Sequence, residues 1–63
     1  MEKTEQYVIY CDHHFYETID RKYWPEITEE DAIKYAENLH SLTGVEVVVK
    51  KETVEVIWKG DAE

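Results

Sequence analysis

The sequence predicts an α+β domain in which one helix packs on a small, four-stranded, mainly antiparallel sheet, in the order ββαββ. Three observations predict it: a capped helical stripe in the middle of the chain, two alternating β-branched runs after it, and strand-like runs before it. A chain of 63 residues accommodates one domain. We therefore expect a single domain over residues 1–63, with residues 1–4 and 60–63 frayed.

The first two strands are expected at residues 5–11 and 15–19. Both runs are rich in aromatic and β-branched residues, which favour extended backbone. The polar segment 12–14 lies near the turn between them. The charged segment 20–22 breaks the pattern, so the second strand is expected to end before it.

A helix is expected from Thr28 to Thr43. Thr28 is a good N-cap, and Asp31 three residues later completes a capping box with Asp in place of Glu. Gly44 follows as the expected left-handed cap at the C-terminal end. The residues at helical spacing that form the expected buried stripe are Ala32, Ile33, Ala36, Leu39 and Thr43.

A β-hairpin is expected after the helix, from the alternating runs 45–50 and 53–59. A turn centred on Lys51-Glu52 places one wholly apolar face toward the helix, which fixes the register. Because Lys-Glu is a poor type I′ turn, we expect a four-residue loop with the same register. The facing pairs are Val49 with Val54, Val47 with Val56, and Val45 with Trp58, and the other face carries Glu46, Val48, Glu55 and Ile57.

One helix covers only one face of a sheet, so apolar residues are expected on the uncovered face. Val48, Ile57 and part of the segment 7–10 are predicted there. Because exposed apolar and aromatic patches usually mark interfaces, one hypothesis is a structural or self-associating module that homodimerises through this face. The alternative is that the terminal segments or the segment 20–27 fold over it.

The charge balance excludes some partners. Fifteen Asp and Glu residues against seven Lys and Arg give a net charge of −8. Direct binding to nucleic acid or to anionic membranes is not expected, because both depend on basic residues. A basic protein surface is the natural complement. The single Cys11 suits a reducing compartment, and no apolar run approaches the length of a transmembrane helix, so we expect a cytoplasmic protein.

The segment Cys11-Asp12-His13-His14 contains metal-ligating residue types, and His40 is a further candidate. Structural zinc sites use spaced pairs of ligands, which this segment does not provide, so no metal site is expected. Nucleophilic catalysis by Cys11 needs a base within hydrogen-bond reach, and no such arrangement can be assigned. With Gly44 and Gly60 as the only glycines, a Gly-rich phosphate loop is excluded. We therefore expect neither a cofactor nor an enzymatic activity.

The candidate partner-binding surface combines an aromatic segment with the acidic start of the helix. Rings supply the desolvated anchors that interfaces need, and acids supply steering and register. One hypothesis is that these acids imitate phosphate charge and occupy the basic groove of a nucleic-acid-binding target. The alternative is an ordinary solvated helix face. The residues of this surface are Tyr23, Trp24, Glu26, Glu29, Glu30, Asp31 and Glu37.

In size, acidity and lack of catalytic groups, the chain is similar to small phage-encoded inhibitors. These include uracil-DNA glycosylase inhibitors, anti-CRISPR proteins and inhibitors of host RNA polymerase. The resemblance is one of composition and carries over no residue. It implies a stoichiometric inhibitor or regulator that binds a basic protein surface as a DNA mimic.

Overall fold

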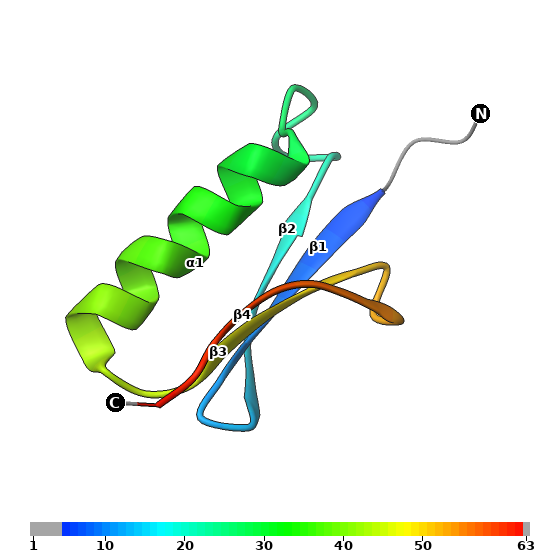
Figure 1. Ribbon diagram of the computed structural model, residues 1–63. Coiled ribbons are helices and arrows are strands. Elements are labelled where there is room, and N and C mark those ends of the chain that lie inside the picture. The colour runs from blue at the N-terminus through cyan, green and yellow to red at the C-terminus, as the bar shows by residue number, and fades with distance from the viewer. Residues whose placement is uncertain (1–4, 63) are drawn as a thin grey trace.

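The computed structural model describes residues 5–62, and the fraying expected for residues 1–4 and 63 lies outside the described residues. The predicted α+β fold and the order ββαββ are confirmed. The strands form one sheet in the order β2-β1-β3-β4, with all neighbours antiparallel, and α1 lies along one face of it (Figure 1). The elements are β1 (Gln6–Cys11), β2 (His14–Asp20), α1 (Glu29–Thr43), β3 (Val47–Lys51) and β4 (Glu55–Gly60).

A two-residue turn joins β1 to β2. Asp12 and His13 form it with positive φ angles of 52° and 69°, the backbone twist that suits a tight hairpin. Further along, the register shifts by one residue, because Ile9 faces Glu17 whereas Tyr10 faces Phe15. The residue between them is an extra one in β2, and such a bulge changes which side chains meet the neighbouring elements.

Both ends of α1 form as predicted. The Thr28 hydroxyl accepts a hydrogen bond from the Asp31 N–H at 3.1 Å, and the Thr28 N–H donates to the Asp31 carboxylate at 3.2 Å. Gly44 adopts a left-handed φ of 71°, and its N–H donates to the His40 carbonyl at 2.8 Å. These local bonds satisfy backbone groups that a helix end otherwise leaves unpaired.

The buried stripe of α1 is shorter than predicted. Ala32 and Ala36 are fully buried, and Ile33 and Leu39 are half-buried. Thr43, expected to be buried, is exposed at the end of the helix, where its hydroxyl donates to the Leu39 carbonyl at 2.9 Å. The contact of α1 with the sheet is therefore centred on its two alanines.

The core lies between α1 and one face of the sheet. Alternate residues of β1 and β3 supply it, as expected where side chains point to opposite faces in turn. Ile27, directly before the N-cap, is fully buried beside them. The buried core residues are Tyr7, Ile9, Ile19, Ile27, Ala32, Ala36, Val47 and Val49, with Cys11, Leu39, Ile57 and Trp58 packed against them.

The register of the β3–β4 hairpin differs from the prediction. The turn is centred on Glu52 and Thr53, which have φ angles of 55° and 69°, so Val54 is 82% exposed. Val49 pairs with Trp58. The predicted four-residue loop on Lys51-Glu52 and the facing pairs Val49 with Val54, Val47 with Val56, and Val45 with Trp58 are therefore wrong.

A contact with the start of β1 accounts for this register. The Glu52 carboxylate accepts hydrogen bonds from the N–H groups of Glu5 and Gln6. The Glu52 N–H in turn donates to the Gln6 carbonyl at 3.2 Å. These bonds join residues far apart in the sequence and hold the turn at Glu52.

The end of the chain is more ordered than predicted as far as residue 62. A register shift between Val49 and Lys50 makes Ile57 an extra residue in β4, and Ile57 packs against the core instead of the open face. Gly60, expected to be frayed, is the buried last residue of β4. His40 Nε2 donates to the Asp61 carbonyl at 2.7 Å, so this segment is attached to the last turns of α1.

The helix does not cover the four strands equally. It packs chiefly against β3 and less against β4 and β1, and β2 has the least contact with it. Because β2 is also an edge strand, it is left uncovered on its outer side. The helix itself is neither long enough nor apolar enough to cross a membrane.

Val47→Glu and Val54→Glu together test the observed register. Val47 is fully buried, so an unpaired carboxylate there should lower the free energy of unfolding by more than about 3 kcal/mol. Val54 is exposed, so its variant should stay within about 0.5 kcal/mol of the parent. Urea titration followed by circular dichroism measures both. Equal destabilisation would instead support the register in which Val54 faces the helix.

Candidate protein-binding site

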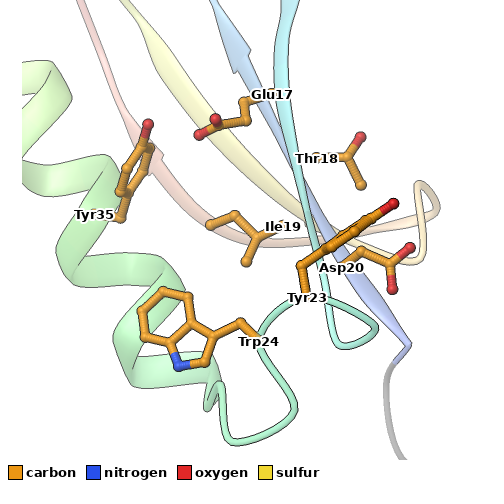
Figure 2. A pocket seen from close by; sticks show the side chains of 7 residues that line it. All are labelled: Glu17, Thr18, Ile19, Asp20, Tyr23, Trp24 and Tyr35. Atoms are coloured by element: carbon orange, nitrogen blue, oxygen red, sulfur yellow. The ribbon is translucent and has the colours of Figure 1, made fainter.

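A groove of about 380 Å³ lies between β2 and the first half of α1. It exists because α1 sits over the other strands and leaves β2 uncovered. Figure 2 shows Trp24, Tyr35 and Glu17 on the helix side of β2, and Tyr23 beside Thr18 on the other side of the strand. The residues of this aromatic groove are Glu17, Thr18, Ile19, Asp20, Tyr23, Trp24 and Tyr35.

Asp20 holds the loop that presents the two rings. Its carbonyl accepts hydrogen bonds from the N–H groups of Tyr23 and Trp24, both at 3.0 Å, and its carboxylate accepts from the Lys22 N–H at 2.8 Å. At the other end of the loop, the N–H of buried Ile27 donates to the Trp24 carbonyl at 3.1 Å. The loop is therefore fixed at both ends, yet Tyr23 is 88% and Trp24 44% exposed.

Tyr35 and Glu17 bridge the groove from α1 to β2. The Tyr35 hydroxyl points toward the Glu17 carboxylate (Figure 2). Hydrogen bonding to that carboxylate, together with partial burial and its negative charge, raises the pKa of Tyr35 from 10.0 to about 12. The neutral hydroxyl therefore remains a donor to Glu17 throughout the physiological range.

The predicted site residues fall into two separate surfaces. Tyr23 and Trp24 line the aromatic groove. At about 100° per residue, Glu30 and Glu37 lie about 140–160° around the helix axis from Tyr35, and so outside the groove. Asp31 is half-buried and serves in the capping box. Among the acids of the candidate surface, Glu26 is exposed in the loop. The exposed acids on α1 are Glu29, Glu30 and Glu37, which we call the acidic helix face.

One cation lies within the acidic helix face. Lys34 Nζ is 3.4 Å from the Glu30 carboxylate, one helical turn away, and both side chains are largely exposed. An exposed pair of this kind contributes only about 0.3–0.5 kcal/mol. The face therefore keeps a net negative charge.

The sequence reasoning missed the half of the groove that comes from β2 and from Tyr35. One signal was available. Tyr35 and Leu42, seven residues apart, lie on the same flank of α1 but outside the predicted stripe. Leu42 is 86% exposed, so this flank of the helix carries apolar side chains without a strand beneath them.

The open face of the sheet is more polar than predicted. Lys50 Nζ lies 4.9 Å from the centre of the Tyr10 ring, and the Glu46 carboxylate lies 3.2 Å from His13 Nδ1 and 3.6 Å from Lys59 Nζ. Val48 is half-buried among these groups. In the segment 20–27, Tyr23 lies on the side of β2 away from the helix (Figure 2), whereas Ile27 at its end belongs to the core on the helix side.

Within residues 5–62, no group of three or more His, Cys, Asp or Glu side chains is placed to hold a metal ion. Cys11 is half-buried against the core. His13 lies beside Glu46, and His40 lies beside Trp58, with ring centroids 6.1 Å apart. These side chains thus have separate surroundings.

Comparison with known proteins leaves the site to be interpreted from its chemistry. No protein-family model, curated protein or solved structure matches the chain. The groove combines rings from a hydrogen-bonded loop and from α1 with carboxylates on an edge strand. Such a surface is suited to binding another protein, because aromatic anchors and charged groups dominate protein interfaces.

Tyr35→Phe tests the bond to Glu17 through its pH dependence. Because the pKa of Tyr35 is raised in the folded state, its stabilising effect is complete below pH 10 and is lost as the pH rises through about 12. The parent should therefore exceed the variant in free energy of unfolding at neutral pH, and this difference should shrink between pH 10 and 12. Urea titrations across that range measure it.

Tyr23→Phe is the matched control, since it removes a hydroxyl from the same groove on the other side of β2. A pH-dependent difference of the same size in both variants would contradict the assigned role of Glu17.

Proposed function

We propose that this chain is a small protein-binding inhibitor or regulator, acting in the cytoplasm, that occupies a basic, nucleic-acid-binding surface of a target protein as a DNA mimic. One observation carries the proposal: exposed rings and exposed acids occur within a few residues of one another at the start of α1, on two separate surfaces of the molecule. Glu26 follows Tyr23 and Trp24 on a loop that hydrogen bonds hold in place, and Glu29 is the first residue of α1.

The charge supports a basic partner. The net charge of −8 creates a field that attracts a cationic surface and raises the rate of encounter. Within α1, the acidic helix face carries three exposed carboxylates, and Lys34 neutralises part of their charge through its contact with Glu30. Desolvation of this face costs less against a partner rich in Lys and Arg, because those groups replace the water around the carboxylates.

The spacing of the acids supports the mimicry of nucleic acid. Glu30 and Glu37 are seven residues apart on one face of α1, which corresponds to about 10.5 Å along the axis. The rise of three nucleotides along one strand of DNA is about 10 Å. A basic groove whose cations are spaced about 10 Å apart along the DNA axis can therefore accept carboxylates at this separation.

The rings support binding that is held by more than charge. Trp and Tyr are over-represented among the residues that dominate interface energies, because they bury a large area with little loss of entropy. Trp24 is exposed over less than half of its surface, and Tyr23 over most of it. In this proposal the acids steer the partner and the rings slow its release.

The double variant Glu30→Lys/Glu37→Lys tests the proposal. Both residues are exposed, so the fold should persist, while capture of partners from a lysate of the source organism should be lost. The partner captured by the parent should be released by DNA and by high salt, because carboxylates and phosphates compete for the same cations. Mass spectrometry and quantitative binding to the identified partner measure this.

The matched control is Glu55→Lys/Asp61→Lys. It changes the net charge equally but at exposed positions in and beside β4, away from the acidic helix face, and should retain binding. If the helix variant binds as tightly as the parent, while folded Val48→Glu does not bind, the acidic helix is an ordinary solvated face. The contact then lies on the open sheet face, where the self-associating alternative places it.

A further inference from the structure

The edge of β2 is open to another strand. β2 has β1 on one side and no described strand on the other. Next to β2, the Arg21 N–H points toward β1, because it donates to the carbonyl of Glu5, the residue before β1, at 2.9 Å. Because backbone groups alternate in direction along a strand, those of exposed Thr18 point away from β1. They form a donor and an acceptor at the sheet edge that have no backbone partner within residues 5–62.

The two sheet edges differ in protection. Natural edge strands are usually blunted by Lys, by Pro, by a bulge or by a covering element. Both edge strands contain a bulge, so they differ in the other devices. β4 carries Lys59 and packs against α1. β2 has neither Lys nor Pro in its sequence HFYETID, and it is the strand with the least contact with α1. The accessible edge is therefore that of β2.

The aromatic groove extends over both faces of this edge. Ile19 and Glu17 lie with Trp24 and Tyr35 on the helix side, and Tyr23 lies on the other (Figure 2). Side chains of an added strand alternate between the same two faces. Successive side chains would thus meet the Trp24–Tyr35 side and the Tyr23 side in turn.

The charge of the groove selects the occupant. Two carboxylates, Glu17 and Asp20, line it among three aromatic rings, and among residues 5–62 no Lys or Arg does. A guanidinium or ammonium group is attracted by both the carboxylates and the ring faces. The groove therefore suits a cationic side chain on an extended backbone.

We propose that β2 accepts an extended basic segment of the target as a fifth strand of the sheet, with an Arg or Lys of that segment in the aromatic groove beside Glu17. This inference rests on the proposed binding of a basic partner and names how part of that partner is held. Backbone hydrogen bonds to Thr18 supply affinity, and the groove supplies the preference for a cation.

A second copy of this chain is a poorer occupant of the same edge. Each copy carries a net charge of −8, so pairing of two β2 strands would bring like charges together. Like charges opposite one another in a strand pair are destabilising.

The test uses a short fluorescent peptide of alternating Arg and Val and a twin in which every backbone amide is N-methylated, so that neither edge of the twin can donate to β2. The two peptides have the same charge and side chains, but the twin cannot complete the hydrogen-bonded ladder. Fluorescence anisotropy should show at least about tenfold weaker binding of the twin to the parent protein. Equal binding of both peptides would overturn strand addition.

Glu17→Gln and Glu55→Gln locate the cation. Each removes one charge, from the groove and from the opposite edge strand respectively. Glu17→Gln should weaken binding of the unmodified peptide by about tenfold, and Glu55→Gln by less than about twofold. Equal effects of the two variants would overturn the assigned position. Thermal melts confirm that both variants remain folded.

Two further outcomes separate the proposals. If the parent is a dimer without peptide and Thr18→Pro makes it a monomer, a second copy occupies β2 and the inference is overturned. If the unmodified peptide binds no better than its twin, while Glu30→Lys/Glu37→Lys abolishes partner binding, strand addition fails and the proposed function stands.

Discussion

The position of the single helix over the sheet is the constraint on which the rest of the structure depends. A helix is about 10 Å wide, whereas four strands spaced about 4.8 Å apart span more than that, so one helix leaves part of the sheet uncovered. The short connection 44–46 from α1 to β3 and the contacts of His40 with Trp58 and Asp61 draw the helix toward β3 and β4. The uncovered strand is therefore β2.

The surface chemistry follows from that position. With no helix above it, β2 faces a flank of α1 that carries Tyr35, and the loop from Asp20 adds Tyr23 and Trp24. These rings are left exposed where a wider helical layer would have buried them. The acids on the outer side of α1 lie on a different face, so the chain offers a partner both long-range attraction and a separate place to dock.

Local signals predicted the elements, and distant contacts decided what the sequence reasoning missed. Thr28, Asp31 and Gly44 fix the ends of α1 through bonds within a few residues, so the helix could be predicted. The hairpin register could not, because it depends on Glu52 and the N–H groups of Glu5 and Gln6, about 46 residues away. The groove was also missed because it depends on distant contacts. It forms only because α1 lies over β3 and β4 and leaves β2 uncovered.

Amide hydrogen exchange of the free protein, measured residue by residue by NMR, tests the central claim that the β2 edge is uncovered. Within β2, Thr18 directs its N–H outward, whereas Ile19 pairs with Tyr7. The account predicts rapid exchange at Thr18 beside slow exchange at Ile19, unchanged on dilution. Slow exchange at both residues would show that another element or a second copy covers this edge, and would contradict the account.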